Sequence, residues 1–184
     1  LLTFIVMLIV GLIVGQLTAR FRYQAYVASA REQRTRHLYE MARELSGALV
    51  VEQVIEIAER CVEASFRVKA RLLLPDEHDR LSPPPVQPGR PKADLSIAQW
   101  CFDRNAPAGL GTDTLPAASR LYLPLKAPMR TRGVLVVAPE RQRWLLIPEQ
   151  RRLLDTFAAL IAIALERVHF VTVARDTLVK MESE

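Results

Sequence analysis

The chain begins with an uncharged apolar run that a water-soluble domain does not expose. Residues 1–15 (LLTFIVMLIVGLIVG) carry no charge, and the apolar character continues to Ala19. A helix needs about 20 such residues to cross a bilayer. The run is apolar on every side, whereas a helix lying on a membrane surface is polar on one face. We therefore predict that residues 1–19 are the C-terminal part of a transmembrane helix, cut within a longer protein.

A cluster of arginines follows this run and indicates its orientation. Its members lie in a stretch whose only acid is Glu32: Arg20, Arg22, Arg31, Arg34 and Arg36. Basic residues next to a span mark its cytoplasmic side, and a secretory signal would carry them before the apolar core. We predict a basic juxtamembrane helix over 20–37 that contacts anionic lipids, with the rest of the chain in the cytoplasm. Basic residues in this arrangement do not indicate a nucleic-acid partner.

The remaining residues alternate between helical and strand patterns. Apolar residues at helical spacing predict helices over 38–49 and 51–62. Short apolar runs predict strands at 68–74, 121–125 and 133–138. Six prolines in residues 75–91 predict a surface loop, and Asp94 is placed to cap a short helix after it. This order predicts an α+β domain over 38–166, with a small antiparallel sheet flanked by helices.

One long helix is predicted from Pro148 onward. Its apolar residues keep a seven-residue register: Leu154, Phe157, Ile161, Ala164, Val168, Val171 and Leu178. Such a register is typical of a two-stranded coiled coil, although Arg175 interrupts it. We predict a dimer seam at Ile161, Ala164, Val168 and Val171. Residues 167–184 would then be a coiled-coil linker.

The segment Ala98–Pro116 (AQWCFDRNAPAGLGTDTLP) has the composition of a small-molecule pocket. Two aromatic rings precede glycines and a group of polar side chains, and pockets combine apolar walls with a few directed polar groups. The candidate ligand-binding residues are Trp100, Phe102, Asp103, Gly109, Gly111, Thr112, Asp113 and Thr114. The alternative interpretation is a rigid loop without a ligand, in which Thr and Asp side chains bond their own backbone.

No catalytic or metal-binding motif is present in the sequence. We expect His37, His78 and His169 to be exposed and not to act as ligands, so no metal site or cofactor is predicted. Cys61 and Cys101 are expected to be buried thiols in a reducing compartment. A redox switch is the alternative, but no basic neighbourhood favours a thiolate at Cys61.

Long motifs in the chain resemble the Kdp-type potassium-responsive sensor histidine kinases. The string AQWCFDRNAPAGLGTDTLP, followed by LYLPL and GVLVV, is similar to their GAF domain. The segments GLIVGQLTARFRYQA and REQRTRHLYEMARELS resemble their last transmembrane helix and arginine segment. PEQRRLLDTFAALIAIALERV and KMESE resemble the helix toward their phosphoacceptor domain. The resemblance implies a GAF-like fold and a homodimeric parent protein that uses ATP and Mg for histidine phosphorylation. It also implies a cognate response regulator as partner.

The resemblance places the chain's catalytic partners outside it. Neither His37 nor His169 is followed by the acidic, Leu, Arg and Thr-Pro residues of the family's phosphoacceptor motif, so this fragment is not expected to be an enzyme. The expected function is a cytoplasmic relay at the bacterial inner membrane, within a kinase that controls potassium-uptake genes. The alternative function is a receptor domain for a cytoplasmic small molecule or ion.

Overall fold

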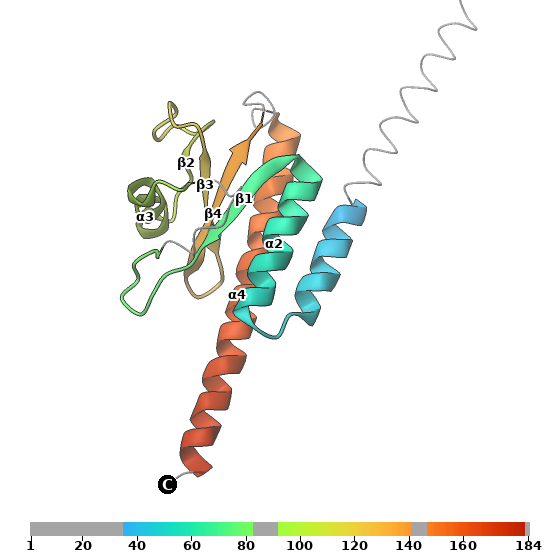
Figure 1. Ribbon diagram of the computed structural model, residues 1–184, viewed down its shortest axis with the longest axis vertical. Helices are drawn as coiled ribbons and strands as arrows, with labels where there is room; N and C mark the ends of the chain where they lie inside the picture. Colours follow the sequence, from blue (N-terminus) through green and yellow to red (C-terminus); the bar gives the residue numbers. More distant parts are fainter. Residues whose placement is uncertain (1–34, 83–91, 141–146, 183–184) are drawn as a thin grey trace, which may run out of the picture. The chain divides into compact units, whose positions relative to one another are not determined.

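The computed structural model of the protein describes residues 35–82, 92–140 and 147–182, with side chains up to residue 175 (Figure 1). Residues 40–184 form one compact unit, and residues 1–39 form a second. The predicted transmembrane helix at 1–19 and the arginines at 20, 22, 31 and 34 lie outside the described residues. Arg36 and His37 are described, and both are exposed.

Helices and strands alternate in the order predicted for an α+β domain. Residues 35–47 are helical, and we call them the N-terminal helix. The elements that follow are α2 (Val51–Phe66), β1 (Val68–Leu73), α3 (Leu95–Arg104), β2 (Ala108–Gly109), β3 (Leu121–Lys126), β4 (Thr131–Pro139) and α4 (Pro148–Glu182). Among the elements in the described part of the chain, the two-residue strand β2 was not predicted from the sequence. As predicted, α4 is a single long helix.

The four strands form one antiparallel sheet in the order β1-β4-β3-β2. Helices α2 and α4 lie on one face of this sheet, and α3 lies on the other (Figure 1). On the α2–α4 side, the Phe66 and Phe157 rings meet edge to face, with centroids 5.1 Å apart. Both rings are buried, so the end of α2 and the first third of α4 share one hydrophobic core.

Pro124 lies where the ladder between β2 and β3 stops. Leu110 donates its N–H to the Arg120 carbonyl on the β2 side of β3, and β2 pairs with β3 only as far as Tyr122. Alternate residues of a strand direct their backbone groups to the same side. Pro124 therefore has its missing N–H on the side that β2 no longer reaches. A proline is tolerated there because no donor is required at that position.

The outer edge of β1 is closed by acidic side chains from α2. The N–H groups of Ala70 and Leu72 donate to Glu63 Oε1 at 3.1 Å and to Glu59 Oε1 at 3.0 Å. The Glu59 side chain is buried, and the hydrogen bond from Leu72 supplies a partner that a buried carboxylate needs. An edge strand with free N–H groups is a template for pairing with another chain, and β1 does not offer one at these positions.

One described helical stretch, Pro148–Arg175, is long and apolar enough to cross a membrane by those two criteria alone. Many of its apolar side chains form the core of the domain, including Leu154, Phe157 and Ile161. The domain itself therefore explains the apolar character of this helix, which carries little weight as evidence for a membrane span.

Candidate functional site

The predicted pocket aromatics are part of a packed core. Trp100 and Phe102 lie on α3 and pack against a buried cluster. That cluster contains Leu73, Leu81, Ala98, Cys101, Ala108, Tyr122, Val134 and Val136. The Tyr122 hydroxyl accepts a hydrogen bond from the Asp94 N–H at 3.1 Å. The side chains of α3 and the sheet therefore fill the space in which a pocket was expected.

The polar loop after α3 bonds mainly to itself. Thr112 Oγ1 donates to the carbonyls of Gly109 at 2.7 Å and Thr114 at 2.8 Å. Gly109 has φ +90°, and a Cβ there would lie 2.1 Å from the Arg120 carbonyl oxygen. Gly111 also has positive φ. The geometry is that of the alternative interpretation, a rigid loop closed by its own backbone.

Two acids of the predicted site have other surroundings. Gln99 Nε2 donates to Asp103 Oδ1 at 2.8 Å and to the Asp79 carbonyl at 3.0 Å, while Gln99 Oε1 accepts from the Leu81 N–H. Asp103 therefore orients Gln99, which fastens the loop after β1 to α3. Asp113 is exposed. In the described part of the chain, the eight predicted residues do not line a common cavity.

The two cysteines are poor candidates for a reactive site. Burial raises the pKa of the Cys101 thiol to about 12. Partial burial and the Glu44 carboxylate raise the pKa of Cys61 as well. Cys61 is half-buried rather than buried as expected. Among the described residues no group of His, Cys, Asp and Glu is arranged to hold a metal ion.

The predicted dimer seam requires a correction. Ile161, Ala164 and Val168 are buried within their own chain, with Val168 only 2 % exposed. Val171, at 58 %, is exposed. The seven-residue register thus records packing inside the domain up to Val168. The first seam residue that is available to a second chain is therefore Val171, nearly three helical turns after Ile161, where the seam was predicted to begin.

The end of the N-terminal helix is held by α4. Arg167 donates from Nη1 to the Ser46 carbonyl at 2.7 Å, and from Nη2 to the carbonyls of Leu45 at 2.7 Å and Ala48 at 2.9 Å. The last carbonyls of a helix have no partner within it and carry partial negative charge. One guanidinium therefore serves as the C-terminal cap of the helix that enters the domain.

Glu166, the residue before Arg167, connects α4 to the β3–β4 hairpin. Glu166 Oε1 accepts from the Met129 N–H and from Arg132 Nη2, both at 3.3 Å. The side chains of Arg132 and Glu166 are 8 % and 9 % exposed, so this ion pair is almost fully removed from water. We call Arg132, Glu166 and Arg167 the α4 junction.

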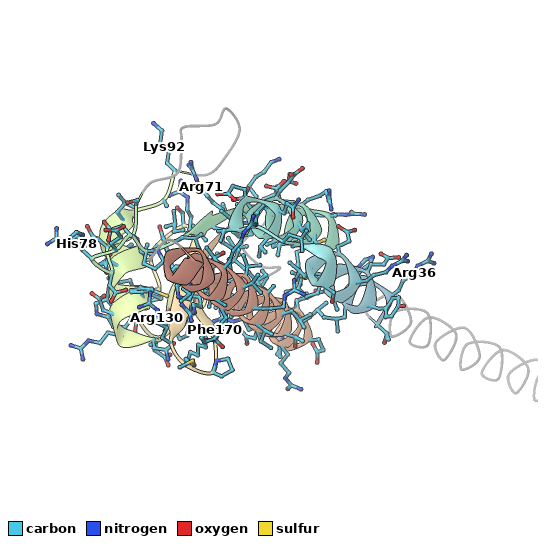
Figure 2. All side chains as sticks on the ribbon, turned by 90° about the horizontal axis from the view of Figure 1, so that it is seen from below. Arg36, Arg71, His78, Lys92, Arg130 and Phe170 are labelled. Carbon is cyan, nitrogen blue, oxygen red and sulfur yellow. The ribbon has the colours of Figure 1, made fainter. Side chains whose placement is uncertain are left out.

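The turn of α4 after the junction carries a histidine and an exposed ring. The Arg132 guanidinium lies over the Phe170 ring, 5.8 Å from its centroid, and Phe170 is half-exposed (Figure 2). Partial burial, with the guanidiniums of Arg132 and Arg130, lowers the pKa of His169. His37, His78 and His169 are all exposed, as expected.

Comparison with known proteins identifies the class to which this fold belongs. A sequence profile described as GAF domain matches residues 62–167. The fold is also similar to the GAF domain of an Acinetobacter phosphoenolpyruvate-protein phosphotransferase. That match has a TM-score of 0.57 at 17 % identity and covers 76 % of this chain and 97 % of the other. The chain belongs to the GAF domain family.

Within this family the domain is of the type found in KdpD sensor proteins. The chain is 47 % identical over all 184 residues to the sensor protein KdpD of Escherichia coli strain K12. It matches the crystal structure of the GAF domain of the potassium sensor histidine kinase KdpD from E. coli with a TM-score of 0.71 and 41 % identity. That match covers 75 % of this chain and 96 % of the other. The chain spans about a fifth of the length of the curated relatives it matches.

Proposed function

We propose that this chain is the cytoplasmic relay segment of a membrane-bound sensor histidine kinase that controls potassium-uptake genes. The observation that carries the proposal is the set of three hydrogen bonds from Arg167 to the end of the N-terminal helix. A displacement of that helix changes its contacts with α4, the helix that leaves the domain. The GAF fold supports a sensory module at this position.

The α4 junction gives this relay two inputs. Arg167 contacts the end of the N-terminal helix, so a displacement of that helix acts on Arg167. Glu166 contacts the β3–β4 hairpin, so a displacement of the hairpin acts on Glu166. The two side chains are consecutive on one rigid helix, so a change at either contact acts on the same turn. A relay needs an element with two arrangements that the input stabilises unequally. We assign that role to α4 and its two contacts.

The output of the relay is a parallel homodimer formed beyond the junction. Val171 and the residues after it supply the seam, in place of Ile161, Ala164 and Val168. The parent protein would use ATP and Mg to phosphorylate a histidine and then pass the phosphoryl group to a cognate response regulator. Its location would be the bacterial inner membrane, with this domain in the cytoplasm.

The arginine cluster at 20–36 belongs to the same proposal. Each basic side chain near an anionic surface contributes about 1 kcal/mol, so the cluster holds the cytoplasmic end of residues 1–19 against the lipid headgroups. Changing Arg31, Arg34 and Arg36 to Gln in the intact kinase is expected to shift its signalling set point and salt sensitivity. Output unchanged across a salt series would contradict the role.

The relay is tested by Arg167→Ala in the full-length parent kinase in membranes. We expect autophosphorylation to persist but to lose most of its dependence on the external potassium concentration. The matched control is Arg152→Ala, an exposed arginine on the same helix. A potassium response equal to that of the native kinase would overturn the relay proposal.

The dimer is tested separately by a cysteine at Val171 in the same protein, with Cys61 and Cys101 changed to Ala. Mild oxidation is expected to cross-link two chains. The control is a cysteine at Glu149, an exposed position in the first turn of α4. Equal cross-linking at both positions, or none at Val171, would contradict the seam.

A further inference from the structure

A cavity lined by both charged and apolar residues lies beside the α4 junction. Its volume is about 490 Å³, within the range of small-molecule sites. Its walls come from the start of α2, the loop after β1, the β3–β4 hairpin and α4. The lining residues are Val51, Leu74, Pro75, Asp76, Glu77, Asp79, Arg130, Arg132, Leu165 and His169. We call it the Arg132 cavity.

Arg132 lacks a hydrogen-bond acceptor that its burial requires. Its side chain is 8 % exposed, and Nη2 reaches Glu166 only at 3.3 Å. Its Nε–H is buried and finds no partner among the described residues. A buried donor without an acceptor is costly, more so on a charged group. In native proteins such a group commonly marks the place of an unseen water or ion.

The acids that face the cavity are partly committed to other groups. Asp76 Oδ1 accepts from the N–H groups of His78 at 2.8 Å and Arg80 at 2.9 Å. Asp79 pairs with Arg130 at 3.3 Å, where both side chains are about half-exposed. Glu77 also lines the cavity and is exposed. The lining of the cavity thus combines a buried guanidinium from β4 with carboxylates from the loop after β1.

We propose that the Arg132 cavity binds a small molecule with a carboxylate or phosphate group and hydrogen-bond donors at its other end. The anionic group supplies the acceptor that Arg132 lacks, after a small rotation of the guanidinium toward the cavity. The donors face Asp76 and Glu77. Polyanions without donors are disfavoured because these carboxylates repel them.

A ligand here acts on the junction directly. It shares Arg132 with Glu166 and so changes how firmly the hairpin is fastened to α4. The regulatory consequence rests on the proposed relay function, whereas the binding itself does not. The site also differs from the predicted one, since none of its lining residues belongs to the eight candidates around Trp100.

Binding is tested on the whole 184-residue chain in detergent by its thermal unfolding. Inorganic phosphate and glycine serve as probes, because both join an anionic group to hydrogen-bond donors. Chloride at equal ionic strength is the baseline. We expect at least one probe to raise Tm by about 2–5 °C at saturating concentration, since a ligand that binds only the folded state stabilises it.

Two variants locate the effect. His169→Trp places an indole at the exposed wall of the cavity and is expected to abolish the shift. Ile163→Trp is the matched control, because Ile163 is exposed on the same helix outside the cavity. Arg132→Lys keeps the charge but loses the planar guanidinium. This variant should need at least tenfold more probe to reach the same rise in Tm.

Each outcome has a defined meaning. A shift that is lost in His169→Trp and kept in Ile163→Trp supports the site. An equal shift in all variants shows a general salt effect and overturns it, as does no shift with either probe. Because this assay has no kinase readout, its failure leaves the Arg167 relay test standing, and failure of the relay leaves the binding result standing.

Discussion

Polar groups on the two faces of the sheet differ in how well their hydrogen bonds are satisfied. Beside α3, the Thr112 hydroxyl bonds its own loop, and Tyr122 accepts from the Asp94 N–H. Beside α4, the guanidinium of Arg132 is buried with one long contact and one unpartnered donor. The first region has the satisfied hydrogen bonds of a structural core. The second retains an unfavourable arrangement at the point where two helices and a hairpin meet.

This difference indicates that composition is a poor guide to where polar groups lack a partner. Aromatic rings, glycines and small polar residues make the α3 region look like a pocket, yet Trp100 and Phe102 pack against a buried cluster and Thr112 bonds its own loop. The α4 side has ordinary composition and an unmet hydrogen-bonding requirement at Arg132. Perturbations on the two sides are therefore expected to differ in kind: those on the α3 side change stability, and those on the α4 side change signalling.

The largest effect is expected on the α3 side from Tyr122→Ala. This side chain is 1 % exposed, and removing a buried aromatic ring costs about 3–5 kcal/mol. Urea unfolding of the chain measures the loss, with Tyr39→Ala as control, because Tyr39 is 67 % exposed. If stability is retained while the potassium response of the parent kinase is lost, the division between the two regions is wrong.

A smaller loss is expected from Gly109→Ala in the loop after α3. An alanine there must tolerate φ +90° and a Cβ 2.1 Å from the Arg120 carbonyl oxygen, which costs about 2–3 kcal/mol. Gly47→Ala is the matched control, because its Cβ would have no neighbour within 4 Å. Equal unfolding midpoints for the two variants would show that the loop is not rigid.

On the α4 side, Arg167→Ala should cost about 1–2 kcal/mol of stability, because three partly exposed hydrogen bonds are lost. Its characteristic effect is local. Amide hydrogen exchange should increase at the end of the N-terminal helix and in the first turn of α2, and remain unchanged in β3 and β4. Uniformly faster exchange would indicate a general structural role instead.

The smallest effect is a pH dependence at His169. Its pKa is lowered in the folded protein, so the unfolded chain binds more protons as the pH falls below about 6.5. Stability is therefore full above that value and decreases below it. Arg130 and Arg132 of the hairpin, Glu166 of α4 and the acids Asp76, Glu77 and Asp79 face this group. His169→Gln should reduce the fall in Tm between about pH 7.5 and 5.5.

Local rules in the sequence predicted most of the fold. Short apolar runs predicted three of the four strands, and helical spacing of apolar residues predicted the long helices. Asp94 caps α3 through the N–H groups of Ser96 and Ile97, as expected. The strand β2 has only two residues, Ala108 and Gly109, and is too short for a periodic signal. Its pairing depends on the positive φ of Gly109 and on β3, which lies later in the chain.

The α4 junction was not predicted because its groups meet only in three dimensions. Arg132 and Glu166 are 34 residues apart, and Arg167 lies 119 to 122 residues from the carbonyls it holds. The one available signal was the acid–base pair Glu166–Arg167 inside an otherwise apolar stretch of helix. For the same reason the register through Val168 was taken as a seam, although it reflects burial against the chain's own core.

The carboxylates of Glu59 and Glu63 along β1 limit how copies of this protein can assemble. An open strand edge favours irreversible association, because strands of two copies can join into one sheet. A neighbouring strand that approaches β1 finds the N–H groups of Ala70 and Leu72 already occupied. It also meets negative charge in place of donors. The blocked edge therefore leaves contacts between copies to helices, which can slide or rotate against each other without unravelling a sheet.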